Sequence, residues 1–214
     1  MKNKIALWIT TLVAVSIPAF GNETTSNKEV PLSAQEVRPL LIGASVPDVG
    51  LETVAGETVK LQEQLGEKPA ILIFYRGGWC PFCNRQLAQL QEIQSSLVDL
   101  GYQILAISPD RPAKLAESAE KIKPSYTLLS DSRMEVASAF GIAFRLDDAT
   151  LTKYRGYGID LEAASGQSHF QLPVPSVFIV GRDGKIGFTY VNPDYKLRID
   201  ADVLLAAARA VMKQ

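Results

Sequence analysis

Both cysteines of the 214-residue chain fall in one four-residue stretch that follows an apolar run. The run, residues 70–75, is a continuous apolar segment of the kind that forms a strand buried on both faces. Cys80 and Cys83 then open a segment of helical periodicity. At a strand-to-helix turn, free backbone N–H groups and the helix dipole stabilise a thiolate. The pair therefore indicates a redox site rather than two structural thiols.

Strand and helix patterns alternate along the rest of the chain. Helical periodicity at 87–100 ends at Gly101, and Gly-Arg-Asp-Gly at 181–184 is typical of a hairpin turn. The stretch 142–172 has no clear pattern, and we interpret it as an insertion near the site. The patterns predict an opening hairpin of 46–49 and 57–60, strands at 70–75, 102–107, 125–129, 176–180 and 185–191, and helices at 87–100, 113–123, 134–140 and 201–212.

The N-terminus has the pattern of a secretory signal. Lys2 and Lys4 precede an apolar stretch, residues 5–17, that is short for a membrane-spanning helix of about 20 residues. Small residues at Ala19 and Gly21 predict cleavage directly after Gly21. We therefore expect residues 1–21 to be a cleaved signal peptide and the protein to be exported to the periplasm. An uncleaved membrane anchor is the alternative.

The remaining chain has the composition of one globular domain. Residues 22–38 are polar and without periodicity, which predicts a flexible lead-in, and 39–214 form the domain. Loss of the first 21 residues lowers Lys plus Arg from 22 to 20 against 23 Asp plus Glu, so the net charge moves from −1 to −3. This charge and the lack of a basic patch predict no binding to nucleic acid. An oxidising compartment favours structural disulfides. A disulfide between two cysteines this close in the chain, however, restricts the unfolded chain very little. The pair is therefore better explained as catalytic than as structural.

Several segments resemble a known superfamily. The order strand, CxxC turn, helix, strand, helix and late hairpin is that of the thioredoxin fold, and residues 74–83 resemble the thioredoxin active-site turn. Over about 41–213 the chain resembles the AhpC/TSA family, the peroxiredoxin-like branch, and is most similar to its CxxC-bearing members. The resemblance implies an α/β thioredoxin-like fold, with a central mixed β-sheet flanked by helices and an N-terminal hairpin extension. The segments that carry it are 46–48, 107–110, 129–131, 172–175, 177–184 and 191–195.

The chain departs from the peroxiredoxin pattern at the site itself. Peroxiredoxins resemble one another in a Pro-x-x-x-Thr-x-x-Cys loop and a later arginine. In a gapless alignment Arg76 falls on the proline, Cys80 on the threonine and Cys83 on the attacking cysteine. The later arginine falls at Pro175, which the thioredoxin resemblance assigns as a cis-proline facing the cysteines. A peroxide pocket then needs other donors, which we expect to be Arg76 and, from the insertion, Arg145 or Arg155.

Two assignments of the attacking cysteine remain open. In the thioredoxin register Cys80 is exposed and attacks, and Cys83 resolves; in the peroxiredoxin register the roles are reversed. We favour Cys80, because solvent access and the helix N-terminus both favour its thiolate. In either register a redox-active Cys80–Cys83 disulfide closes before further oxidation, and a dithiol must reduce it. Trp79, Arg76 and Pro175 are expected to shape the site.

The resemblance implies a thiol-dependent peroxidase that reduces hydroperoxides without a cofactor or metal. Its expected partner is a thioredoxin-like or membrane-relayed thiol reductant. The alternative is an exported protein thiol–disulfide reductase or isomerase, whose protein-disulfide substrate would contact Pro175 and Trp79. A lesser alternative is a copper-binding module in which the two thiolates and His169, the only histidine, hold a soft metal ion. We otherwise expect His169 to be a solvent-exposed loop residue.

Overall fold

The computed structural model describes residues 29–213. The predicted signal peptide, residues 1–21, and residues 22–28 of the predicted lead-in lie outside the described part of the chain. Within 29–213, none of the helices combines the length and the apolar character that crossing a membrane requires.

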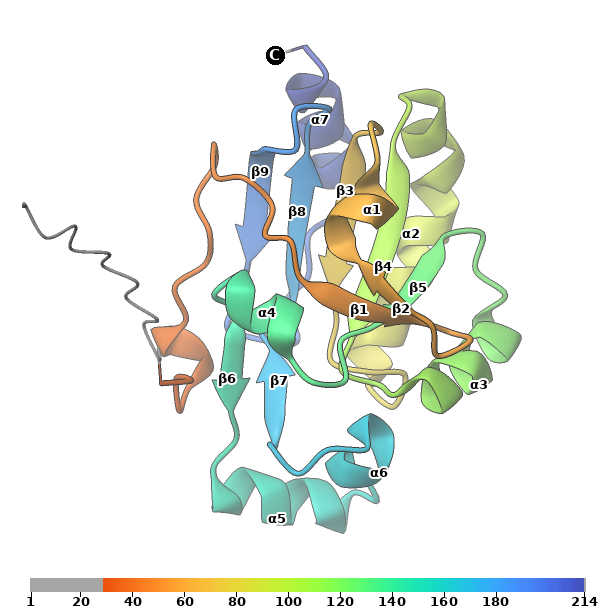
Figure 1. Ribbon diagram of the computed structural model, residues 1–214. Coiled ribbons are helices and arrows are strands. Elements are labelled where there is room, and N and C mark those ends of the chain that lie inside the picture. The colour runs from red at the N-terminus through yellow and green to blue at the C-terminus, as the bar shows by residue number, and fades with distance from the viewer. Residues whose placement is uncertain (1–28, 214) are drawn as a thin grey trace, which may run out of the picture.

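A mixed β-sheet of seven strands forms the centre of the domain (Figure 1). The strands are β1 (Gly50–Thr53), β2 (Thr58–Lys60), β3 (Ala70–Phe74), β4 (Gln103–Ser108), β5 (Thr127–Ser130), β8 (Ser176–Val180) and β9 (Ile186–Val191). Their order across the sheet is β2, β1, β5, β4, β3, β8, β9. Strand β3 lies parallel to β4 and antiparallel to β8, which makes the sheet mixed.

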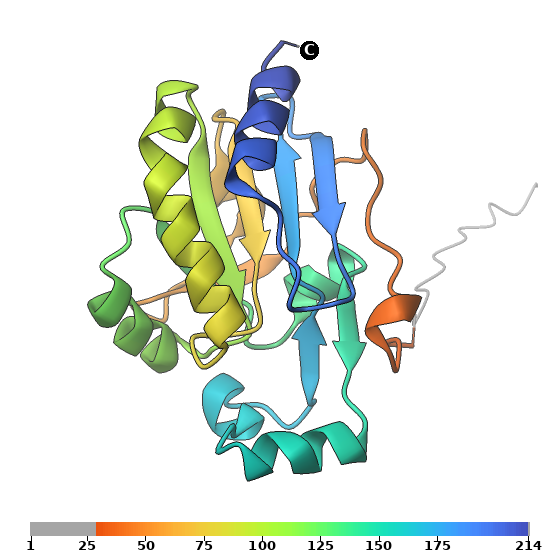
Figure 2. The same ribbon diagram turned by 180° about the vertical axis from the view of Figure 1, so that it is seen from behind.

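Helices cover both faces of this sheet, so every residue of β3 and β8 is buried. One face carries the apolar sides of α2 (Pro81–Asp99), α3 (Pro112–Ile122) and α7 (Ala201–Val211), and Figure 2 shows α2 and α7 side by side there. The other face carries α1 (Leu61–Leu65) and α4 (Glu135–Ala139), which pack around Phe74, Phe140 and Phe178. The expected thioredoxin-like α/β fold is confirmed.

The opening hairpin is present, but its first strand is displaced from the predicted 46–49. That strand is β1, which begins at Gly50 and pairs with β2. Residues 45 and 46 instead contact the β8–β9 turn: Ser45 bridges to Lys185, and the Val46 N–H donates to the Gly184 carbonyl at 3.0 Å. Because Pro47 has no N–H to donate, a strand ladder is interrupted at this point.

The unassigned stretch 142–172 folds into a small unit of its own. It consists of β6 (Ala143–Arg145), α5 (Asp148–Gly156), α6 (Leu161–Ser165) and β7 (Gln171–Pro173), and β6 pairs with β7. The unit lies beyond the end of the main sheet (Figure 1). Its core of Leu146, Leu151, Tyr154, Leu161 and Leu172 also packs against Trp79, so the insertion does lie beside the CxxC turn.

Residues 29–38 lie against the domain rather than apart from it. The Arg145 N–H donates to the Pro31 carbonyl at 2.8 Å, and the Arg38 N–H donates to the Gly141 carbonyl at 3.0 Å. Gly141 has a positive φ of 69°, and a Cβ there would collide with the Arg38 carbonyl. This close approach therefore requires glycine.

Candidate active site

The two cysteines lie where β3 ends and α2 begins. Cys80 directly precedes α2, and Pro81 is its first residue, where the missing N–H leaves no bond unmade. Cys83 follows in the first helical turn. Both are free thiols and both are buried, since Cys80 is 1% exposed and Cys83 is 0% exposed.

The expectation that Cys80 is exposed is therefore wrong. The chain between β9 and α7 folds back to this end of α2, where the ring of Tyr195 packs edge-on against Phe82 with centroids 5.6 Å apart. From the same segment, Arg198 Nη2 donates to Cys83 Sγ at 3.3 Å. Contacts from a loop more than a hundred residues away have no signature in the CxxC motif itself.

The two thiols differ in acidity. A hydrogen bond from Cys83 lowers the pKa of Cys80 to about 6, against the opposing effect of burial, and the charges of Arg76 and Arg198 add to the lowering. Burial raises the pKa of Cys83 well above its ordinary value, and the hydrogen bond and charge of Cys80 raise it further. At neutral pH the pair therefore carries one negative charge, on Cys80, while Cys83 keeps its proton.

Arg76 is a buried cation with no carboxylate partner among the described residues. Its guanidinium carbon lies 4.2 Å from the ring centre of Tyr195 and 5.4 Å from that of Tyr154, and Nη2 donates to the Tyr154 hydroxyl. Its backbone N–H points at Cys83 Sγ, 3.5 Å away. A guanidinium that is held by aromatic rings rather than by an acid keeps its charge available to a neighbouring thiolate.

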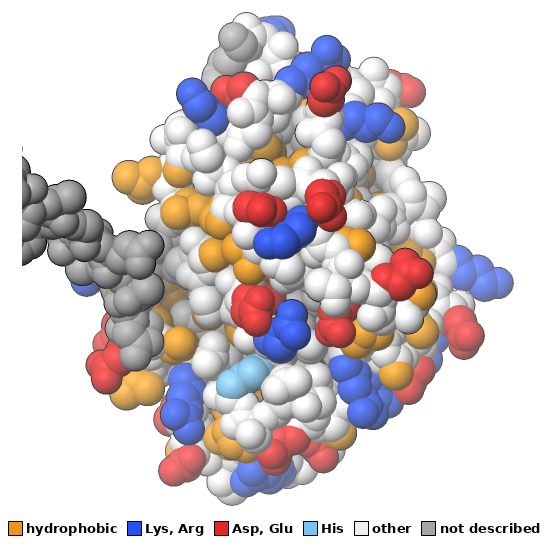
Figure 3. All heavy atoms as spheres, in the orientation of Figure 1, with side chains coloured by type: hydrophobic (Ala, Val, Ile, Leu, Met, Phe, Trp, Pro, Cys, Tyr) orange, Lys and Arg blue, Asp and Glu red, His pale blue; other side chains and the backbone are white. Residues whose placement is uncertain are grey.

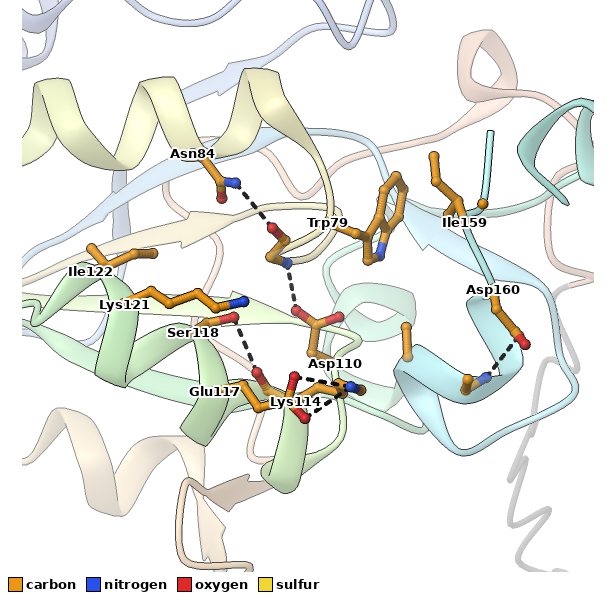
Figure 4. A pocket seen from close by; sticks show the side chains of 14 residues that line it. Trp79, Asn84, Asp110, Lys114, Glu117, Ser118, Lys121, Ile122, Ile159 and Asp160 are labelled. Atoms are coloured by element: carbon orange, nitrogen blue, oxygen red, sulfur yellow. Dashed lines mark hydrogen bonds and ion pairs between the residues drawn. The ribbon is translucent and has the colours of Figure 1, made fainter. Parts of the chain in front are cut away.

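The turn before Cys80 is held by a buried carboxylate that the sequence did not indicate. Asp110, at the end of β4, accepts the Gly78 N–H at 2.7 Å, and Asn84 Nδ2 donates to the Gly78 carbonyl at 3.0 Å (Figure 4). Burial raises the pKa of Asp110 to about 6. Gly77 has a φ of 137°, and a Cβ there would meet the Trp79 indole nitrogen and Asp110 Oδ1. In the sequence, Ser108-Pro109-Asp110 indicated only a resemblance to the AhpC/TSA family, and the sequence predicted no role for Asp110.

Trp79 lies between the CxxC turn and the insertion. Its ring packs edge-on against Tyr154, with centroids 5.8 Å apart. It also lines a cleft of about 430 Å³ between the turn, α3 and the insertion (Figure 4). Trp79 therefore lies between the CxxC turn and the insertion, and its expected part in shaping the site stays a prediction.

Pro175 lies at the site, but the prediction of a cis-proline is wrong. No peptide bond within 29–213 is cis. The Val174 N–H donates to the Ile142 carbonyl at 2.8 Å, directly beside the pairing of Ala143 with Pro173. Pro175 lines a cavity of about 210 Å³ together with Arg76, Arg145, Tyr154 and Tyr195. Arg155 instead lines a separate, smaller cavity beside α5 and α6.

His169 has both ring nitrogens engaged. Nε2 lies 2.8 Å from the Ser132 carbonyl, and Nδ1 accepts the Gln171 N–H at 2.9 Å, so the proton belongs on Nε2. The side chain is half-buried, on a face where acidic and basic side chains are interspersed (Figure 3). Within the described chain, no group of three or more His, Cys, Asp or Glu is placed to hold a metal ion. The copper alternative is not favoured.

Fold and site together define a thioredoxin-fold protein with a buried cysteine pair. A family model described as the AhpC/TSA family matches residues 42–189, and the chain belongs to this family. Similar relatives include the putative peroxiredoxin bcp of Haemophilus influenzae, 37% identical over 106 residues that cover 50% of this chain and 68% of the relative. Peroxiredoxin Bcp of Escherichia coli K12 is 34% identical over 106 residues, which cover 50% of this chain and 67% of the relative.

Solved structures agree on the fold. Peroxidoxin BcpB from Mycobacterium tuberculosis has a TM-score of 0.60 at 24% identity, covering 79% of this chain and 96% of that one. Reduced Prx3 from Vibrio vulnificus, in complex with hydrogen peroxide, has a TM-score of 0.64 at 17% identity, covering 79% and 99%. Peroxiredoxins are thiol-dependent peroxidases, so the expected thiol-dependent oxidoreductase is confirmed and the protein-disulfide alternative is not favoured.

Proposed function

We propose that this protein reduces hydroperoxides through a cycle in which Cys80 and Cys83 pass between dithiol and disulfide. The observation that carries the proposal is a buried pair of thiols contacted by two arginines: the Arg76 N–H and Arg198 Nη2 both point at Cys83 Sγ, and the pKa of Cys80 is lowered beside them. A low-pKa thiolate is the reactive form toward peroxide, and burial of the reduced pair favours a small oxidant.

In the first step the Cys80 thiolate attacks the peroxide oxygen. The S–O bond forms as the O–O bond breaks, and the departing alkoxide or hydroxide takes a proton and leaves as alcohol or water. Arg76 stabilises the thiolate and the charge that develops on the departing oxygen. We place the peroxide at the cavity of about 210 Å³, where Arg76 and Arg145 supply donors and Tyr154, Pro175 and Tyr195 supply the walls. Neither cysteine lines this cavity; Arg76 links the two, because it lines the cavity and its N–H points at Cys83 Sγ.

In the second step Cys83 attacks the oxidised sulfur of Cys80. The S–S bond forms, the S–O bond breaks, and the oxygen leaves as water. A dithiol reductant then returns two electrons and two protons to the pair. We propose a thioredoxin-like protein for this role, or a membrane-relayed thiol donor if the N-terminal residues 1–21 direct export to the periplasm.

Burial of the sulfurs supports peroxide over protein disulfide as the oxidising substrate. Exchange with a protein disulfide needs an in-line approach of three sulfurs and therefore an accessible one. At 1% and 0% exposure, neither Cys80 nor Cys83 offers such an approach in the reduced protein.

Two assays on the same purified protein test the proposal. With dithiothreitol as reductant, wild-type protein should consume hydrogen peroxide or cumene hydroperoxide catalytically, whereas Cys80→Ser should not. Reduction of insulin disulfides should stay near the uncatalysed rate. Rapid insulin reduction together with slow peroxide consumption would reverse the assignment in favour of protein disulfide exchange.

A further inference from the structure

Arg198 is a second guanidinium at the cysteine pair, and it comes from a distant part of the chain. It lies in the segment between β9 and α7, and its Nη2 donates to Cys83 Sγ at 3.3 Å. Its Nε and Nη1 are buried and find no hydrogen-bond partner among the described residues. Side-chain donors buried without an acceptor are rare, which points to a partner that appears during the reaction.

The surroundings of Cys83 change when Cys80 is oxidised. In the reduced pair, burial, the hydrogen bond to Cys80 and the charge of Cys80 all oppose ionisation of Cys83, while Arg198 and the Arg76 N–H favour it. Tyr75 also interacts with Cys83, but Tyr75 is itself buried and stays neutral, because burial raises its pKa. Oxidation turns the Cys80 thiolate into a neutral sulfenic acid. Both opposing effects of Cys80 are then lost, and the two N–H donors remain.

We propose that Arg198 is a catalytic residue of the second step: its guanidinium stabilises the Cys83 thiolate once Cys80 is oxidised, and so promotes disulfide closure. The inference rests on the proposed peroxidase cycle. Cys83 gives up its proton, its sulfur bonds to the Cys80 sulfur, and the sulfenic oxygen leaves as hydroxide, which that proton converts to water. The unpartnered Nε and Nη1 donors are available to this departing oxygen.

The assignment separates the roles of the two arginines. Arg76 lines the cavity where the peroxide is placed, whereas Arg198 does not and instead contacts the sulfur of the resolving thiol. Arg198 is the last of the effects that lower the pKa of Cys80, so at a pH well above that pKa its loss should spare sulfenate formation and slow the disappearance of the sulfenate. A thiol that resolves slowly leaves Cys80 open to a second peroxide and to irreversible sulfinic acid.

Single-turnover oxidation of Arg198→Ala, Arg198→Lys and the control Arg209→Ala tests this. Arg209 is an exposed arginine on the neighbouring helix α7. Reduced proteins are mixed with one equivalent of hydrogen peroxide at pH 8, above the pKa of Cys80. At intervals, the sulfenate is trapped with dimedone, and the amounts of trapped sulfenate and of disulfide are measured by mass spectrometry.

The expected result is specific to the second step. Arg198→Ala should form sulfenate within about threefold of the wild-type rate and close the disulfide about tenfold or more slowly, the effect of about one pKa unit on the resolving thiol. Closure in this variant should also move to higher pH, and Arg198→Lys, which keeps the charge, should recover most of the rate. Arg209→Ala should match wild type.

Each failure has its own signature. Closure at the wild-type rate in a folded Arg198→Ala protein would overturn the role of Arg198 and leave the peroxidase cycle intact. Equal slowing in Arg198→Ala and Arg198→Lys, with no shift of the pH profile, would assign a packing role instead. If wild-type protein forms neither sulfenate nor disulfide at a rate above that of a free thiol, the proposed function itself fails.

Discussion

The guanidinium of Arg76 lies over the ring of Tyr195, with its central carbon 4.2 Å from the ring centre. This contact joins the turn after β3 to the segment between β9 and α7, which are more than a hundred residues apart in the chain. The same segment brings Arg198 to Cys83. The reduced cysteines are therefore enclosed by this segment, and we expect the segment to move after the disulfide has formed, so that a protein reductant can reach the pair.

Reactivity of the pair should follow the ionisation of Cys80. Its pKa is lowered to about 6, so the rate of oxidation by hydrogen peroxide should rise with pH through about 6 and level off above 7. An unperturbed thiol would reach this plateau only above about 9. Stopped-flow oxidation of the reduced protein between pH 4.5 and 9 measures the midpoint. A midpoint at 8 or above would show that the thiolate is not stabilised.

Removal of the Arg76 charge should slow the first step. In Arg76→Met, which keeps much of the buried volume, the midpoint of the pH profile should move up by on the order of one unit. The peroxide rate at pH 7 should fall about tenfold or more, because the guanidinium also stabilises the charge on the departing oxygen. Arg85→Met, an exposed arginine on α2, is the matched control. Equal rates in the two variants would remove Arg76 from the chemistry.

Asp110 should make stability depend on pH. Its pKa is raised to about 6 in the folded protein, so the folded state holds the proton more tightly than the unfolded state does. Stability should therefore fall as pH rises from about 4 through 6, by at most on the order of 3 kcal/mol. Asp110→Asn, which can still accept the Gly78 N–H, should lose this dependence. Thermal unfolding of both proteins between pH 4 and 8 gives the comparison.

Asp131 should also make the protein less stable as pH rises, because burial raises the pKa of its carboxyl group to about 7. Its carboxylate accepts the N–H groups of Val136 and Ala137 and is present in both proteins. The informative quantity is therefore the difference between wild type and Asp110→Asn. A difference that does not vary with pH would contradict the assignment to Asp110.

Gly77 should tolerate no side chain. Its φ of 137° and the proximity of Trp79 and Asp110 predict that Gly77→Ala destabilises the protein by about 2 kcal/mol or more and lowers peroxidase activity. Gly156, at the end of α5, has open space at its Cβ position. Gly156→Ala should be neutral or stabilising by up to about 1 kcal/mol. Denaturant unfolding of both variants tests the contrast.

The local features of the site could be predicted from the sequence, whereas the loop that encloses it could not. Apolar runs and helical spacing indicated β3 and α2, because such patterns report burial along one element. The roles of Arg198 and Asp110 depend on how distant elements meet, and neither residue belongs to a motif with a known spacing. The insertion was unassigned because β6 and β7 are too short for a periodic pattern to emerge.

Two errors have the same origin. Exposure of Cys80 and a cis bond before Pro175 were both carried over from the thioredoxin resemblance. Beside the first of these positions, Tyr195 packs against Phe82 and Arg198 contacts Cys83; at the second, the Val174 N–H is hydrogen-bonded to the Ile142 carbonyl. A resemblance in the CxxC turn extends to the backbone of that turn, but it does not extend to the segments that pack upon it.

The most direct test is rapid mixing of reduced Cys83→Ser and Cys80→Ser proteins with hydrogen peroxide, followed by trapping with dimedone and mass spectrometry. The cycle proposed here predicts fast formation of a sulfenate on Cys80 in Cys83→Ser and only slow oxidation of Cys83 in Cys80→Ser. Fast sulfenate formation on Cys83 would reverse the roles of the two cysteines. Oxidation of both variants at the rate of an ordinary free thiol would contradict peroxide reduction as the function of the pair.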